Sequence, residues 1–141
     1  MSHWNTLKHL AQKYPITNMC HMDTNGYPHM NLMHILESDK LGRFVISISK
    51  SSQKYQEIKG NTKGSWTIGS LLGEHAELSG DVEVLEFCPE NEALFKEVWS
   101  EVLTRYGQEQ MSAERVLLVM NARDIKIISI QNKVVQQVKV Q

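Results

Sequence analysis

Apolar side chains recur every three or four positions in two segments of the chain, which is the spacing of one face of an α-helix. The first segment ends at Pro15, which cannot continue a helix. Its apolar face comprises Trp4, Leu7, Leu10, Ala11 and Tyr14. The second segment, residues 89–107, has Pro89 in its first turn and Gly107 at its end, as helices often do. Its predicted buried face comprises Leu94, Phe95, Val98, Val102 and Leu103, with Trp99 at the margin.

Elsewhere apolar and polar positions alternate, which predicts β-strands. Residues 16–23 and 27–37 are two extended runs joined through Asn25-Gly26, a pair that favours a two-residue type I′ hairpin turn. Further strands are predicted at 43–49, 64–70, 75–87, 114–122 and 124–130, with a last one in 133–140. Residues 52–60 predict a short helix, and Gly80 indicates a bulge. Six or more short strands with only three helices predict a mainly β fold, an antiparallel barrel with peripheral helices.

Length, composition and charge narrow the class of protein. The 141 residues suffice for one domain, spanning 1–141, and the 41% hydrophobic and 22% charged residues are typical of a soluble globular protein. A net charge of −1 provides no field that would hold nucleic acid or an anionic membrane. The first helix has no unbroken apolar run, so we expect neither a signal peptide nor a membrane span, and a cytoplasmic protein. Cys20 and Cys88 are far apart and indicate free thiols.

Six histidines raise the question of a metal site. With Asn25 and Gly26 as the turn, Met22 would pair with His29, and His21 with Met30. His21 and His34 would then share one face of the hairpin and His29 would lie on the other, so the three could not converge on one ion. We therefore expect no metal site.

No motif of a nucleophilic or nucleotide-hydrolysing enzyme is present: the chain has no GxSxG, HExxH or Walker-type glycine loop. The hairpin is rich in methionine, which could line a flat aromatic ligand or simply fill a core.

The stretch SISKSSQKYQEIKGN, residues 47–61, leads from a strand into a helix. Ser47 and Ser49 lie on the polar face of the strand, and Ser51 and Ser52 precede Lys54. Hydroxyls, a lysine and the free amides of a helix start can hold a phosphate. Alternatively, Ser52 caps the helix and Lys54 is solvated. The residues alone leave both interpretations open.

The order of these features resembles the FMN-binding split-barrel family that includes pyridoxamine 5′-phosphate oxidase and the general stress proteins. The resemblance runs from the first helix to residue 130 and rests on DTNGYPHMNLMHI, RFVISISKSSQKYQEIKGN, ELSGDVEVL, PENEALFKEVW and VLLVMNARDIKIISI. It implies a six-stranded antiparallel split β-barrel with flanking helices, and FMN bound at the interface of a homodimer.

When the cofactor-binding positions of the family are matched to this sequence residue by residue, the resemblance implies the following cofactor contacts. The strand along the flavin ring matches His29, Met30, Asn31, Leu32 and Met33. The phosphate side matches Ser47, Ile48, Ser49, Ser52, Gln53 and Lys54. The chain departs from the family at Asn31, where many relatives have arginine, at Leu36, where the oxidases have lysine, and at Gln53, where they have a second basic residue. Fewer cations predict weaker phosphate binding.

The C-terminal QNKVVQQVKVQ lacks the arginine- and tryptophan-containing substrate motif of the true oxidases, which argues against vitamin B6 oxidation. The leading hypothesis is thus an FMN-dependent oxidoreductase acting on an unidentified small molecule. The alternatives are a non-catalytic flavin- or haem-binding stress protein and a dimeric split barrel that binds no ligand.

Overall fold

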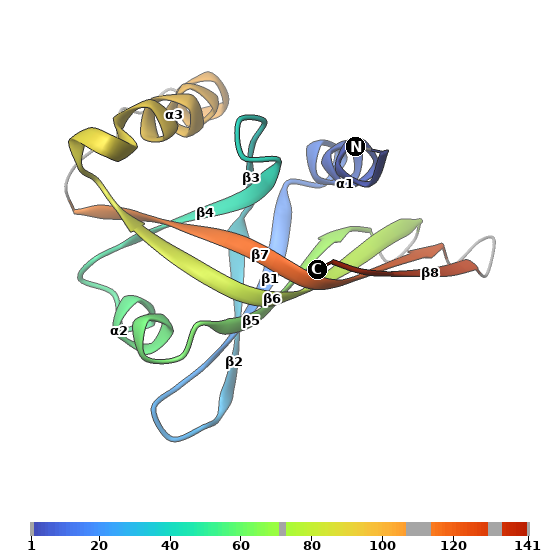
Figure 1. The fold of residues 1–141 in the computed structure, drawn as a ribbon, viewed down its shortest axis with the longest axis horizontal. Helices are drawn as coiled ribbons and strands as arrows, with labels where there is room; N and C mark the ends of the chain where they lie inside the picture. The colour runs from blue at the N-terminus through green and yellow to red at the C-terminus, as the bar shows by residue number, and fades with distance from the viewer. Residues whose placement is uncertain (1, 71–72, 107–113, 130–133, 141) are drawn as a thin grey trace.

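The computed structural model describes residues 2–70, 73–106, 114–129 and 134–140, through which one antiparallel sheet runs (Figure 1). Its strands are β1 (Ile16–Met22), β2 (Pro28–His34), β3 (Leu36–Ser38), β4 (Arg43–Ser49), β5 (Lys63–Gly69), β6 (Glu74–Glu86), β7 (Arg115–Ser129) and β8 (Val134–Lys139). The helices are α1 (Ser2–Lys13), α2 (Gln53–Gly60), the 3₁₀ turn η1 (Pro89–Asn91) and α3 (Glu92–Tyr106).

The strands pair in the order β2-β1-β5-β6-β7-β4-β3, and β8 adds to the free part of β7. Because β2 and β3 end this path without pairing to each other, the sheet curls into a barrel that stays open. The prediction of a mainly β split barrel flanked by helices is confirmed. The sheet contains eight strands where the resemblance implied six. Residues 36–38 form a separate short strand, and the last predicted strand pairs as β8.

Two apolar clusters lie on opposite faces of the sheet. The barrel cluster, centred on the fully buried Trp66, also takes in Leu7 and Leu10 of α1 and Ile58 of α2. The α3 cluster comprises Leu36, Val45, Phe95, Val98, Trp99, Leu117 and Val119. Trp99 is buried rather than marginal, whereas Tyr14 is exposed because α1 ends before it. The side chains of Val102 and Leu103, predicted to be buried, lie outside the described ones.

Strand β7 corrects the prediction of two strands at 114–122 and 124–130. Ser79 pairs with Asp124 and Gly80 with Ala122, so Arg123 is the extra residue of a bulge. Before the bulge Val116, Leu118 and Met120 enter the barrel cluster, and after it Ile125 and Ile127 do. The change of alternation made one strand look like two. A bulge does lie at Gly80, as predicted, but its extra residue is in β7 and not in the strand that contains Gly80.

The register of the first hairpin was predicted wrongly by one residue. His21 pairs with His29 and Met22 with Pro28, which leaves Thr24, Asn25 and Gly26 as a three-residue loop. Asp23 causes the difference: its Oδ1 accepts hydrogen bonds from the backbone N–H groups of Asn25 and Tyr27, both at 2.9 Å. Gly26 has φ of 84°, as expected where a turn is followed by a left-handed residue.

The corrected register places His21 and His29 on the same face, with His34 on the opposite one. The helices in the described ranges include none that is both long and apolar enough to cross a bilayer.

Candidate functional site

The start of α2 is closed by Ser52. Its backbone is extended (φ −77°, ψ 148°), its Oγ accepts from the Tyr55 N–H at 3.4 Å, and its hydroxyl donates to the Ser49 carbonyl at 2.7 Å. The helix-cap interpretation of Ser52 therefore holds, and its hydroxyl proton is already used within the chain.

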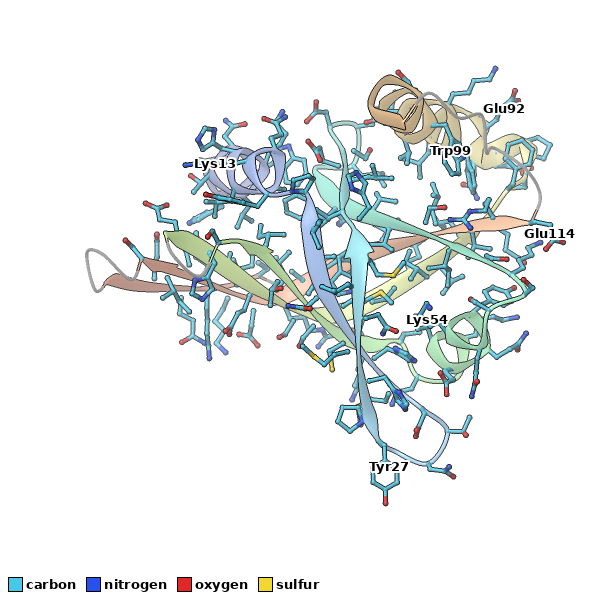
Figure 2. The ribbon with its side chains drawn as sticks, turned by 180° about the vertical axis from the view of Figure 1, so that it is seen from behind. Lys13, Tyr27, Lys54, Glu92, Trp99 and Glu114 are labelled. Carbon is cyan, nitrogen blue, oxygen red and sulfur yellow. The ribbon has the colours of Figure 1, made fainter. Side chains whose placement is uncertain are left out.

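Lys54 follows this cap and is partly buried (Figure 2). Two neighbouring lysines are engaged: Lys50 pairs with Glu86 at 3.2 Å, and Lys59 donates to the Tyr55 hydroxyl at 3.3 Å. Within the part of the chain that the structure describes, Lys54 has no hydrogen-bond or ion-pair partner. Its ammonium group is thus free to meet an anion.

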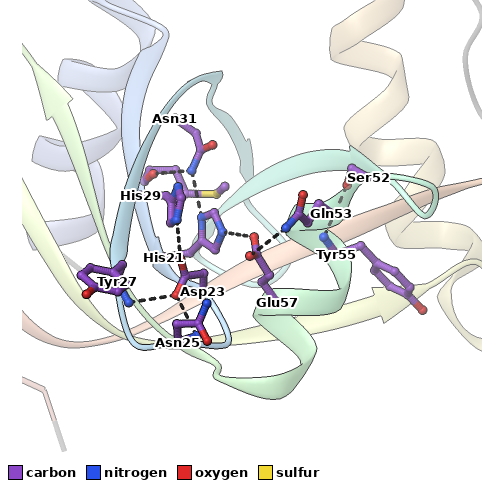
Figure 3. A network of polar contacts seen from close by, with 11 residues as sticks. His21, Asp23, Asn25, Tyr27, His29, Asn31, Ser52, Gln53, Tyr55 and Glu57 are labelled. Atoms are coloured by element: carbon purple, nitrogen blue, oxygen red, sulfur yellow. Dashed lines mark hydrogen bonds and ion pairs between the residues drawn. The ribbon is translucent and has the colours of Figure 1, made fainter.

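A buried histidine and glutamate join the hairpin to α2 (Figure 3). His21 Nε2 lies 2.9 Å from Glu57 Oε1, and both residues are less than one-tenth exposed. Asn31 donates to His21 Nδ1 at 2.9 Å, and Gln53 donates to the other Glu57 oxygen at 3.4 Å. Asn31 and Gln53 stand at positions where the family resemblance suggests cations. Both direct their side-chain amides to the His21–Glu57 pair.

A second histidine and carboxylate lie beside the first. His29 Nε2 is 2.7 Å from Asp23 Oδ2, and the His29 ring stacks on that of His21 with centroids 5.5 Å apart. The hydrogen bond from His29, followed by that from the Tyr27 N–H, holds the pKa of Asp23 below its ordinary value. Asp23 is thus a carboxylate at neutral pH. The His29 side chain is 50% exposed and can reach a ligand.

We call His21, His29, Asn31, Gln53, Lys54 and Glu57 the hairpin–helix site. Asn31, Gln53 and Lys54 were predicted from the resemblance to contact the cofactor, as was His29. His21 and Glu57 were not predicted, because a buried pair formed by a strand and a helix 36 residues apart has no local sequence signal.

The other predicted residues are distributed over different faces. Met33 shares the face of His29 and Asn31, whereas Met30 and Leu32 point outward and are 68% and 76% exposed. Ile48 is buried in the barrel cluster, so only its backbone could meet a ligand. Ser47 and Ser49 alternate with Ile48 and lie on the face of the α3 cluster. The assignment of these residues to a cofactor stays a prediction.

Sequence reasoning also missed Arg115, which holds the end of β4. Its Nε donates to Ser47 Oγ and its Nη2 to the Ser47 carbonyl, each at 3.2 Å. Burial lowers the pKa of its guanidinium group, which nevertheless remains charged at neutral pH. The only sign of this role in the sequence was a single arginine at the start of an apolar strand.

Two cavities lie near the sheet, and the second reaches His21 of the hairpin–helix site. A cavity of about 680 Å³ lies between α1 and strands β4, β6 and β7, and one of about 530 Å³ lies against β1, β5, β6 and β7. Neither includes a residue of β2 or α2. Among the described residues, no three His, Cys, Asp or Glu side chains are grouped as metal ligands.

Comparisons with known proteins give a consistent result. A model of the family described as pyridoxamine 5′-phosphate oxidase matches residues 7–129. No curated protein matches the chain significantly by sequence.

Solved structures resemble the fold closely at low identity. General stress protein 26 from Bacillus anthracis is 17% identical, with a TM-score of 0.75, over 99% of this chain and 100% of that one. A pyridoxamine 5′-phosphate oxidase-related, FMN-binding protein from Nostoc punctiforme is 8% identical, with a TM-score of 0.71, over 99% and 95%. A haem-binding protein from Mycobacterium smegmatis is 12% identical, with a TM-score of 0.75, over 99% of this chain and 58% of that one. At these identities the likeness concerns the fold.

Proposed function

Because the chain belongs to the pyridoxamine 5′-phosphate oxidase family, we propose that it binds FMN or a related flavin. In this proposal the protein is a cytoplasmic homodimer that uses the flavin for redox chemistry on an unidentified small molecule. The description of the Nostoc relative as an FMN-binding protein supports the choice of cofactor.

One observation carries the proposal: Lys54 lies unpartnered, as far as the structure describes the chain, at the capped start of α2. A phosphate there would meet an ammonium group and the positive end of a helix dipole. The neighbouring Lys50 and Lys59 are already engaged, so Lys54 would be the main cationic contact. The ring of the flavin would lie along β2 on the side of His29, Asn31 and Met33.

The chain itself would orient the ligand and exchange protons, while the bound isoalloxazine would supply electron transfer. His29 suits proton exchange. The Asp23 carboxylate accepts a hydrogen bond from the Nε2–H group of His29. In its neutral form the His29 ring therefore presents Nδ1 as the basic nitrogen. Half of the His29 side chain is exposed. Carboxylate-held imidazoles act in this way as general bases.

The purified protein should bind FMN in an absorbance titration, with the oxidised flavin band near about 450 nm shifting or sharpening on binding. Absence of binding at any FMN concentration tested would refute the proposed cofactor. Reduction of the bound flavin by NADH or NADPH, followed by reoxidation with an electron acceptor, would support an enzyme.

A second candidate function is non-catalytic binding of a flavin or haem. The haem-binding protein from Mycobacterium smegmatis, whose fold is similar, favours this alternative. Binding of flavin without catalytic turnover would support this non-catalytic alternative. Binding of haem in place of flavin would support it as well. A third candidate, a dimeric split barrel without ligand, would bind neither.

The outward face of the first hairpin supports a homodimer. Ile16, Met30 and Leu32 lie on this face and are 60%, 68% and 76% exposed, and such an apolar patch commonly marks an interface. A partner packed there would also lie close to the hairpin–helix site, because β2 carries residues of both.

We expect Leu32→Glu to convert the dimer to a monomer in size-exclusion chromatography with light scattering, because it buries a charge in the interface. Leu41→Glu is the matched control, since Leu41 is an exposed leucine outside the hairpin, and it should stay dimeric. A monomeric wild-type protein, or a dimer in both variants, would exclude this interface.

A further inference from the structure

The Asn31 amide fixes the protonation of the buried histidine. Its Nδ2 lies 3.0 Å from the Met19 carbonyl oxygen and 2.9 Å from His21 Nδ1. A carbonyl oxygen can only accept, so the Asn31 atom that faces it must be the nitrogen. The second amide hydrogen then points to Nδ1 of His21, which must be an acceptor.

It follows that the His21 ring is neutral and carries its single proton on Nε2. This proton is donated to Glu57 Oε1, at 2.9 Å. Glu57 thus receives a hydrogen bond but no positive charge from His21. Its other oxygen receives only the long 3.4 Å bond from the neutral Gln53 amide.

Both oxygens of Glu57 thus accept hydrogen bonds, as the oxygens of a carboxylate do, and neither meets a cationic partner among the described residues. Water screens the group only weakly in this position. Glu57 is 8% exposed and belongs to the same helix as Lys54, one turn further on. Lys54 is the single unpartnered cation of the hairpin–helix site, so the site is close to electroneutral before any ligand binds.

A phosphate monoester brings about 1.5 to 2 further negative charges at pH 7. Lys54 can offset only part of them, and the rest would lie in the field of a poorly screened carboxylate. A sugar alcohol chain ending in hydroxyls brings no charge. Its O–H groups can donate to Glu57, which as a carboxylate can only accept.

We propose that the hairpin–helix site selects flavins without the terminal phosphate, so that riboflavin binds more tightly than FMN. This inference rests on the proposed flavin-binding function and specifies the class of ligand. Glu57 is the specificity-determining residue, and His21 and Asn31 hold it in place as a hydrogen-bond acceptor.

The test compares dissociation constants for riboflavin and FMN, measured by flavin fluorescence with the full-length protein. For the wild type we expect the lower constant for riboflavin. Glu57→Gln keeps the shape of the side chain and removes its charge, and should improve FMN relative to riboflavin by roughly 100- to 1000-fold. Glu77→Gln, at an exposed carboxylate of β6, is the matched control and should leave the ratio unchanged.

Gln53→Arg is a second variant, at an exposed position. It exchanges the long amide contact to Glu57 for a guanidinium group and leaves the His21–Glu57 contact in place. The added cation should also shift the preference toward FMN. Tighter binding of FMN than riboflavin by the wild type would overturn the inference but support the proposed function. A ratio unchanged in both variants would also overturn it. Binding of neither flavin would overturn the proposed function and this inference together.

Discussion

Lys54→Ala is expected to weaken FMN binding by roughly 10- to 150-fold. The variant removes a charge-assisted contact to the phosphate, which contributes about 1.5–3 kcal/mol. No other cation of the site can replace it, since Lys50 and Lys59 are engaged with Glu86 and Tyr55. Titration of the flavin fluorescence measures the effect directly.

Riboflavin provides the internal control for this variant. It has no phosphate, so its affinity for Lys54→Ala should remain close to that of the wild type. Lys96→Ala, at an exposed lysine of α3 that pairs with Glu92 at 3.0 Å, should change neither affinity. An equal loss for both flavins would mean that Lys54 supports the fold of the site and does not contact phosphate.

Gly80→Ala is expected to lower the free energy of unfolding by about 3 kcal/mol. A Cβ at this position would lie 2.1 Å from the Asn121 carbonyl oxygen and 2.8 Å from the Ala122 Cα, which are backbone atoms of the paired strand. Relief would require β6 and β7 to separate at the bulge. Urea denaturation followed by circular dichroism measures the change.

Gly60→Ala is the control for this substitution. No atom lies within 4 Å of the Cβ that it would add at the end of α2, so stability should change by less than about 1 kcal/mol. Equal stability of Gly80→Ala and the wild type would mean that the bulge rearranges freely and does not require glycine.

The alternating strands, the three helices and the bulge at Gly80 could be predicted because each has a local cause. The strand pattern follows from side chains that face one cluster or the other, and the first helix ends at Lys13, just before Pro15. The register of the hairpin could not be predicted in this way. Asn25-Gly26 favours a two-residue turn, but the Asp23 side chain competes by binding two backbone amides and lengthens the loop.

The division of β7 into two predicted strands has a comparable cause. A bulge inverts the alternation without ending the strand, and the sequence alone cannot distinguish this from a turn. The paired strand determines that a bulge forms here, because Gly80 of β6 has no side chain and leaves space for the β7 backbone.

Only the part of the candidate site that a short sequence motif marks could be predicted. Ser52 and Lys54 mark the start of a helix, and their positions follow from residues within one turn. Glu57 and His21 come together only through the packing of α2 against the hairpin, so their pairing depends on tertiary structure. The error in register had a direct effect on the site, since it placed His21 and His29 on opposite faces of the hairpin.

The three-residue loop at the tip of the hairpin has a consequence for how its sequence can change. Exposed hairpin loops usually accept insertions and deletions at little cost. Here one oxygen of Asp23 closes the loop, and the other holds the His29 ring. A gain or loss of a single residue would therefore alter loop closure and the orientation of His29 together, so the length of this loop is constrained by the site that it adjoins.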